Sequence, residues 1–131
     1  MEADNKKLKI LLVDDDRFLL DMYSLKFKNS GLDVDTAINS ETALKKLRDG
    51  NSYSAILLDI IIPGKDGLEF LKMAKEEKLI KDSLVIILTN QPDEFDKSKS
   101  LGADGYILKA TTIPSEVVSQ VLSICKAKSA R

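Results

Sequence analysis

Short runs of aliphatic residues alternate along the chain with segments in which apolar residues recur at helical spacing. Each run is four to six residues long and rich in Ile, Leu and Val. Runs of this length and composition predict strands that are buried on both faces. They lie at residues 8–13, 34–38, 53–58, 84–88 and 105–108.

The segments between the runs predict amphipathic helices, because their apolar residues fall on one face and Lys, Asp and Glu on the other. We expect Asp16, Asn39 and Thr112 to be helix N-caps, and Pro114 to lie in the first turn of the last helix. The segment 92–101 predicts a mostly exposed helix, since Phe95 and Leu101 are its only large apolar residues. Glycines at positions 31 and 50 predict helix C-termini.

Five strands that alternate with five helices predict an α/β fold. Right-handed crossovers then give a doubly wound parallel sheet with helices on both faces. The chain has 131 residues, which predicts a single domain over residues 1–131, with a core at about 8–127 and short polar tails.

Composition excludes several classes of function. The chain has no histidine, which rules out histidine-dependent catalysis, and Cys125 is its one cysteine, which rules out an intramolecular disulfide. The formal net charge of −1 provides no attraction to nucleic acid or to anionic membranes, so we expect neither as a direct partner. No apolar run approaches the length of a signal peptide or a spanning helix, which predicts a cytoplasmic protein.

Polar residues collect where the predicted strands end. Carboxyl ends of neighbouring parallel strands form one crevice, the usual ligand site of such sheets. Carboxylates that lie together repel one another unless a cation binds, and oxygen ligands favour a hard cation, Mg²⁺ or Mn²⁺. Without histidine, the expected nucleophile is a carboxylate. The residues concerned are Asp14, Asp15, Asp59, Thr89 and Lys109.

Four motifs in order make the chain resemble a response-regulator receiver domain of the chemotaxis-regulator type. They are LLVDDD at 11–16, LLDIIIPGKDG at 57–67, IILTN at 86–90 and GADGYILKA at 102–110. The resemblance implies a flavodoxin-like (βα)₅ fold with strand order 2-1-3-4-5.

The resemblance also implies a role for each site residue. Asp59 is the phosphoacceptor, while Asp14, Asp15, Asp59 and the backbone carbonyl of Ile61 hold the metal. Thr89 and Lys109 contact the phosphoryl group, and Tyr106 changes position with Thr89. Pro63 and Gly67 match the loop after the phosphoacceptor.

The function that the resemblance implies is two-component signal transduction. A histidine kinase or a phosphotransfer protein donates the phosphoryl group to Asp59 with Mg²⁺, and a protein-interaction surface then changes. The domain is then not an enzyme but a phosphoacceptor that assists its own phosphorylation and dephosphorylation. It is expected to be a monomer or a weak phosphorylation-dependent dimer. Its downstream target or fused output domain is unknown.

Three alternatives compete with this interpretation. The Asp14–Asp16 run fits the D-x-D of haloacid-dehalogenase-like phosphatases, but Arg17 and Phe18 follow where Gly and Thr are expected. An FMN-binding flavodoxin-like protein needs a phosphate loop where the three aspartates lie. The third alternative is a receiver-like adaptor that is never phosphorylated, but such a protein would not need the complete phosphorylation site that this sequence has.

Two residues depart from the usual receiver pattern. Ala110 follows Lys109 where most receivers have a proline after a cis peptide, so we predict a trans Lys109–Ala110 bond. Asn90 follows Thr89 where Ala, Ser or Gly is common, which predicts narrower access for phosphodonors.

Overall fold

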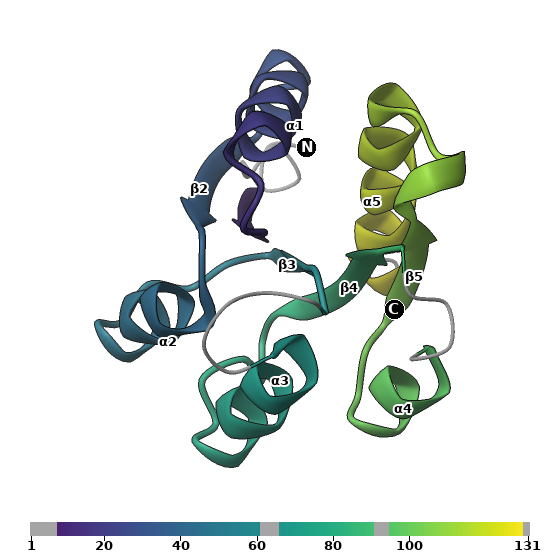
Figure 1. Cartoon of the computed structure of the whole chain (residues 1–131). Coiled ribbons are helices and arrows are strands. Elements are labelled where there is room, and N and C mark those ends of the chain that lie inside the picture. Colours follow the sequence, from purple (N-terminus) through teal and green to yellow (C-terminus); the bar gives the residue numbers. More distant parts are fainter. Residues whose placement is uncertain (1–7, 61–65, 91–94, 130–131) are drawn as a thin grey trace.

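The computed structural model describes residues 8–60, 66–90 and 95–129. Five parallel strands form one sheet in the order β2-β1-β3-β4-β5, which confirms the predicted fold class and strand order (Figure 1). The strands are β1 (Lys9–Val13), β2 (Asp33–Ala37), β3 (Ala55–Leu58), β4 (Leu84–Thr89) and β5 (Gly105–Leu108). The helices are α1 (Arg17–Asn29), α2 (Ser40–Arg48), α3 (Gly67–Glu76), α4 (Phe95–Ser100) and α5 (Pro114–Ser129), with a 3₁₀ helix η3 (Lys109–Thr111).

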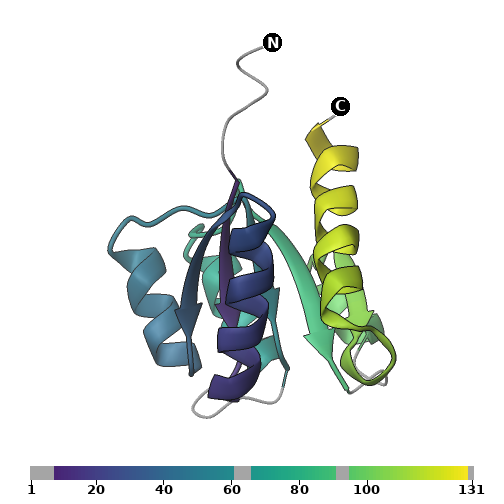
Figure 2. The ribbon, with the colours of Figure 1, turned by 90° about the horizontal axis from the view of Figure 1, so that it is seen from above.

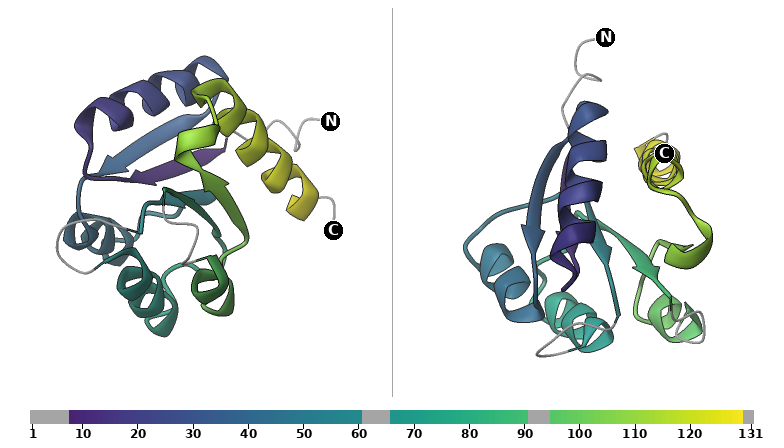
Figure 3. Two further views of the ribbon diagram at one scale, coloured as in Figure 1. Left: turned by 45° about the vertical axis from the view of Figure 1, so that its right-hand side comes forward. Right: turned by 45° about the horizontal axis from the view of Figure 1, so that its top comes forward.

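Helices cover both faces of the sheet. Helices α1 and α5 pack on one face, and α2, α3 and α4 pack on the other (Figure 3). Alternate residues of β1 serve the two sides: Ile10 and Leu12 pack against α1 and α5, whereas Leu11 and Val13 face α2 and α3. This alternation explains why the central strands read as continuous apolar runs.

The edge strand β2 corrects one expectation. Burial on both faces holds for β1, β3 and β4, but of the five residues of β2 only Ala37 is buried. The other edge strand, β5, is buried on one face only, through Gly105 and Ile107. Because β2 has a neighbour on one side alone, its outer residues remain partly exposed to solvent and include the polar pair Asp35 and Thr36.

Most predicted helix boundaries are confirmed. Asp16 accepts from the backbone N–H of Leu19 and caps α1, and Asn39 accepts from Thr42 and caps α2. Thr112 is not an N-cap, because the chain after β5 first forms η3 and α5 begins only at Pro114. The glycines at 31 and 50 have the expected positive φ, and Cys125 is buried on α5. In the segment 92–101, helix α4 extends over residues 95–100 and is largely exposed.

The parallel arrangement places every strand's carboxyl end at the same edge of the sheet, where α1 and α5 begin (Figure 2). That edge carries the candidate site. Among the helices of the described residues, none combines the length and the apolar character needed to cross a membrane.

A polar network ties β2 to its neighbours. Lys46 Nζ lies 2.5 Å from Asp35 Oδ1, and the Tyr53 hydroxyl donates to Asp35 Oδ2 over 2.7 Å. Burial by itself raises the pKa of Asp35, but the hydrogen bonds from Lys46 and Tyr53 outweigh it and hold the pKa below its usual value. The ionised carboxylate therefore stabilises the fold.

We predict that Asp35→Asn lowers the free energy of unfolding at pH 7 by about 1–2 kcal/mol, because charged hydrogen bonds are lost. The folded pKa of Asp35 lies below its unfolded value of 3.8. The stabilisation is thus present above the unfolded pKa and is lost as pH falls through the folded pKa. The difference between wild type and variant should shrink from pH 7 to pH 3 in urea unfolding.

The matched control is Asp49→Asn. Asp49 pairs with Lys45 on the surface, and its side chain is 55% exposed, so the change should stay within about 0.5 kcal/mol at either pH. Equal effects of the two substitutions would contradict a structural role for the Asp35 network.

Candidate functional site

Strand pairing places the acidic residues. Asp14 and Asp59 directly follow β1 and β3, and the backbone ladder continues into them: the Asp14 N–H donates to Ala37 O over 3.1 Å, and the Asp59 N–H donates to Val13 O over 3.0 Å. These bonds hold both aspartates in register at the carboxyl edge. Thr89 ends β4, and Lys109 follows β5.

The side chains meet as the sequence predicted. Lys109 Nζ donates to Asp59 Oδ2 over 2.7 Å and also to Asp14 Oδ2. Thr89 Oγ1 donates to Asp59 Oδ1 over 3.0 Å. Both carboxylate oxygens of Asp59 are therefore oriented by donors, while the residue remains 9% exposed.

Burial and charge act in opposite directions in this cluster. Desolvation raises the pKa of Asp14 above its usual value, although the hydrogen bond from Lys109 lowers it. Desolvation disfavours the ammonium of Lys109, but its hydrogen bonds to Asp14 and Asp59 prevail and raise its pKa. Lys109 is therefore charged at neutral pH.

The donor set fits a hard divalent cation. Asp14, Asp15 and Asp59 each offer a carboxylate oxygen, and these oxygens lie within 4.8 Å of one another. Three carboxylates against one ammonium leave an excess of negative charge, and Asp15 is exposed, so an ion can enter from solvent. Oxygen-only ligands favour Mg²⁺ or Mn²⁺ over zinc. Ile61 and Pro63, predicted to contribute a carbonyl and a loop, lie outside the described residues.

Gly67 lets α3 begin directly beside Asp59. Its N–H donates to Ile60 O over 2.7 Å, and a Cβ on it would lie 2.4 Å from the backbone oxygen of Asp59. Any side chain at this position would displace the backbone of the candidate phosphoacceptor. A capping box of Asp66 and Glu69 fixes the start of α3 at the same place.

Tyr106 lies on β5 beside α4. Its ring contacts Phe95 with 5.1 Å between centroids and an interplanar angle of 34°. The Tyr106 hydroxyl is buried, and no hydrogen-bond partner for it occurs among the described residues. A buried hydroxyl without a partner carries a free-energy cost that another ring position could relieve.

The two residues that depart from the receiver pattern contact each other. The N–H of Ala110 donates to Asn90 Oδ1 over 2.7 Å. No cis peptide occurs in the described residues, so the Lys109–Ala110 bond is trans as predicted. Asn90 is exposed at the rim of the site.

Tyr23 is a neighbour of the site that the sequence analysis did not identify. It was predicted only as part of the apolar face of α1, yet it lines a small gap with Asp14 and Asp59. Burial raises its pKa; the charge of Lys109 opposes this effect, and the carboxylates of Asp14 and Asp59 add to it. Its helical spacing with Leu20 and Phe27 carries no signal that distinguishes it from a core residue.

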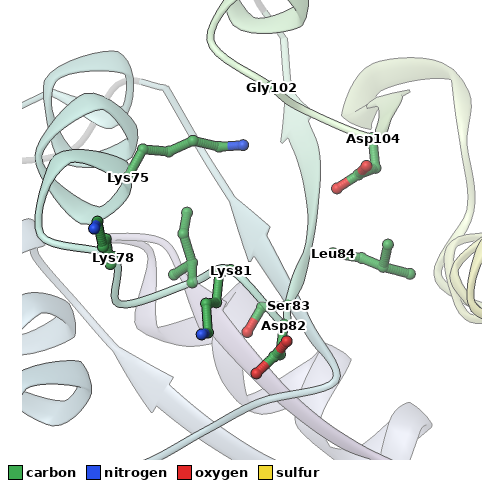
Figure 4. A pocket seen from close by; sticks show the side chains of 9 residues that line it. Lys75, Lys78, Lys81, Asp82, Ser83, Leu84, Gly102 and Asp104 are labelled. Atoms are coloured by element: carbon green, nitrogen blue, oxygen red, sulfur yellow. The ribbon is translucent and has the colours of Figure 1, made fainter.

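A cavity of about 450 Å³ lies at the other end of the sheet, between the end of α3 and the start of β4. Figure 4 shows the side chains of Lys75, Lys78 and Lys81 pointing in different directions around it. Because these ammonium groups do not converge, the cavity lacks the geometry of an anion site. The acidic edge remains the candidate functional site.

Comparison with known proteins assigns the family. Residues 10–121 match the response regulator receiver domain. The chain belongs to this family. Receiver domains are the modules of two-component systems that work with histidine kinases and output domains, and they bind Mg²⁺ through an acidic pocket.

The relatives of this receiver domain include longer regulators. The alkaline phosphatase synthesis transcriptional regulatory protein PhoP of Bacillus subtilis is 37% identical over 120 residues, which cover 90% of this chain and 48% of PhoP. The chain thus spans about half the length of this and other curated relatives that it matches.

Solved receiver domains have the same fold. A CheY-like receiver domain protein from Methanospirillum hungatei aligns with a TM-score of 0.85 at 26% identity, over 95% of this chain and 98% of that one. TrrA of Thermotoga maritima, in complex with Mg²⁺ and BeF, aligns with a TM-score of 0.76 at 33% identity, over 89% of this chain and 98% of the TrrA chain.

We predict that Mg²⁺ raises the melting temperature of the receiver domain in proportion to log concentration above the Kd, since the ion binds the folded acidic cluster. Asp15→Asn should abolish most of this rise. Without Mg²⁺ it should melt no lower than wild type, because it removes one of three like charges. Thermal unfolding with increasing MgCl₂ measures both effects.

Asp21→Asn is the matched control for Asp15→Asn, because Asp21 is an exposed carboxylate on α1 outside the cluster. It should respond to Mg²⁺ as wild type does. A full Mg²⁺ response in Asp15→Asn would show that the ion binds elsewhere.

We also predict opposite outcomes for two Tyr→Phe substitutions. Tyr106→Phe removes a hydroxyl without a described partner, so the free energy of unfolding should stay unchanged or rise by up to about 1 kcal/mol. Tyr53→Phe removes the donor to Asp35 and should lower the free energy of unfolding by about 1–2 kcal/mol. Chemical denaturation of both variants measures the two free energies of unfolding. A larger loss of stability in Tyr106→Phe than in Tyr53→Phe would show that the Tyr106 hydroxyl does have a hydrogen-bond partner.

Proposed function

We propose that this receiver domain accepts a phosphoryl group on Asp59 from a phosphohistidine of a histidine kinase or a phosphotransfer protein. The observation that carries the proposal is the pair of donors on Asp59. Lys109 and Thr89 each hold one of its oxygens, and the adjacent carboxylates offer a metal site. The chain has no histidine, so the donor histidine belongs to the partner.

In the proposed reaction an oxygen of Asp59 attacks the phosphorus atom of the partner's phosphohistidine. An O–P bond forms and the N–P bond breaks, and the imidazole nitrogen keeps the electron pair and takes up a proton. The ammonium of Lys109 neutralises charge beside the acceptor, and the Thr89 hydroxyl can donate to a phosphoryl oxygen. The domain acts as the phosphoacceptor in this scheme, not as an enzyme that turns over a separate substrate.

Asp14, Asp15 and Asp59 are the residues that would hold Mg²⁺, with the Ile61 carbonyl as a further predicted ligand. When bound, the ion neutralises phosphoryl oxygens and reduces their repulsion by the carboxylates. Asp15 is exposed whereas Asp14 is buried and held by Lys109. We therefore assign capture of the incoming ion to Asp15.

Two exposed apolar residues flank the proposed entry to the site. Phe18, in the first turn of α1, is 75% exposed, and Ile113, just before α5, is 60% exposed. Both lie at the carboxyl edge, where α1 and α5 begin (Figure 2). We assign contact with the phosphodonor to this part of the surface.

The proposed output surface consists of α4, β5 and α5 around Tyr106. Thr89 can bond a phosphoryl oxygen only by adjusting its present contact with Asp59. The Tyr106 ring packs against Phe95, but its hydroxyl has no hydrogen-bond partner among the described residues that would oppose a change of ring position. Helix α4 has six residues, of which Ser98 alone is buried. A small change at Thr89 can therefore shift an element that is already weakly held.

The alternatives fit the geometry less well. In a haloacid-dehalogenase-like phosphatase Asp16 would work beside Asp14, but its side chain caps α1 instead. Three carboxylates at the first strand end would repel the phosphate of FMN. An adaptor without phosphorylation has no use for two donors on Asp59. The cytoplasmic location, the single-domain organisation and the oligomeric state stay predictions.

The proposal predicts that Asp59→Asn keeps the fold and loses the phosphoryl adduct, because an amide cannot act as the nucleophile. The test incubates wild type and variant with acetyl phosphate and Mg²⁺ and then measures the intact mass. Wild type should gain one phosphoryl group. A wild-type rate of mass gain in Asp59→Asn would overturn the assignment of Asp59.

Adding beryllofluoride and Mg²⁺ to wild type and to Asp59→Asn tests the proposed output surface. The solved relative TrrA carries Mg²⁺ and BeF, and we expect the pair to change amide exchange in α4 and β5 of wild type but not of Asp59→Asn. Unchanged exchange in wild type would refute the proposed surface change.

A further inference from the structure

Asn90 and Ala110 connect two loops of the site through one hydrogen bond. Asn90 directly follows Thr89 at the end of β4, and Ala110 directly follows Lys109 at the end of β5. The bond from the Ala110 N–H to Asn90 Oδ1 is 2.7 Å long and joins residues that are 20 positions apart. The backbone after Thr89 is thus tied to the backbone after Lys109.

The bond requires both departures from the usual receiver pattern. A proline at position 110 has no N–H to donate. An alanine or glycine at position 90 has no side-chain acceptor, and a serine hydroxyl does not reach as far as an asparagine carbonyl. The two unusual residues are therefore donor and acceptor of the same contact.

The bond caps the turn from which Lys109 extends. Ala110 lies in η3 (Lys109–Thr111), whose N-cap residue Leu108 provides no side-chain hydrogen bond. The first N–H groups of a helix lack partners within it, and the amide of Asn90 supplies one from another loop. Lys109 is the first residue of this turn. Its side chain is 10% exposed and forms ion pairs with Asp14 and Asp59.

We propose that Asn90 is a positioning residue for Lys109. Its bond to Ala110 fixes the η3 turn and so holds the ammonium of Lys109 at Asp59. The positioning itself stands on the geometry, while its effect on phosphoryl transfer rests on the proposed function.

The first experiment compares Asn90→Ala with Asn51→Ala. Asn51 is likewise an exposed asparagine with one hydrogen bond to the backbone, to Lys46 O over 2.9 Å, but it lies at the opposite end of the sheet. Without any phosphodonor, Asn90→Ala should speed amide exchange at Ala110 and move the ¹⁵N signal of Lys109 Nζ. Phosphorylation by acetyl phosphate should slow by about fivefold, the factor expected for the loss of one hydrogen bond.

Asn51→Ala should leave all three readouts at their wild-type values. Unchanged signals at Ala110 and Lys109 in Asn90→Ala would overturn the proposal. So would faster phosphorylation with an unmoved Lys109 signal, because Asn90 would then act only by narrowing access to the site. If wild type accepts no phosphoryl group, the proposed function fails, yet the two spectroscopic readouts still decide the role of Asn90.

The second experiment combines Asn90→Ala with Ala110→Pro. Because Ala110→Pro removes the donor, adding Asn90→Ala to it should cause no further change in the phosphorylation rate or in the Lys109 signal. The same fivefold effect on both backgrounds would show that Asn90 does not act through this bond and would overturn the proposal.

Discussion

The ammonium of Lys109, placed between the carboxylates of Asp14 and Asp59, is the contact on which the rest of the site depends. Each of these three side chains is about nine-tenths buried. A buried carboxylate without a partner costs several kcal/mol, and that cost reaches both aspartates if the lysine is displaced. The ion pairs make it possible to keep two buried carboxylates side by side inside the folded domain.

The strand order explains why a lysine has this place. Strand β4 separates β5 from β3, and neighbouring strands lie about 4.8 Å apart, so Lys109 must reach past β4 to meet Asp59 and Asp14. A long side chain bridges that distance. Thr89, on the intervening strand, is close enough to bond Asp59 with a short side chain. The different lengths of the two donors therefore follow from their positions in the sheet.

Much of this arrangement could be predicted from the sequence, because hydrophobic periodicity and strand-end polarity are local signals. The apolar runs located the central strands, and their polar ends identified Asp14, Asp59, Thr89 and Lys109 before any geometry was known. The exposure of β2 was missed, although the strand order implied by the resemblance places it at the edge of the sheet and three of its five residues, Asp33, Asp35 and Thr36, are polar. Asn90 and Ala110 were identified as departures from the receiver pattern, but their hydrogen bond was not predicted, because it depends on how two loops approach each other in the folded domain. The position of Tyr23 beside the site was not predicted either, since its spacing along α1 is that of a core residue.

The missing Cβ of Gly67 has a mechanical consequence. Helix α3 begins in direct contact with the backbone of Asp59, and the Gly67–Ile60 bond and a capping box fix its start there. The first turn of α3 therefore cannot move closer to Asp59 without a backbone clash. On the β4 side, by contrast, Asp59 is contacted by the side-chain hydroxyl of Thr89, and β4 is followed along the chain by α4, the shortest α-helix of the described residues. The missing side chain of Gly67 thus sets the smallest possible separation between strand β3 and helix α3 beside the site.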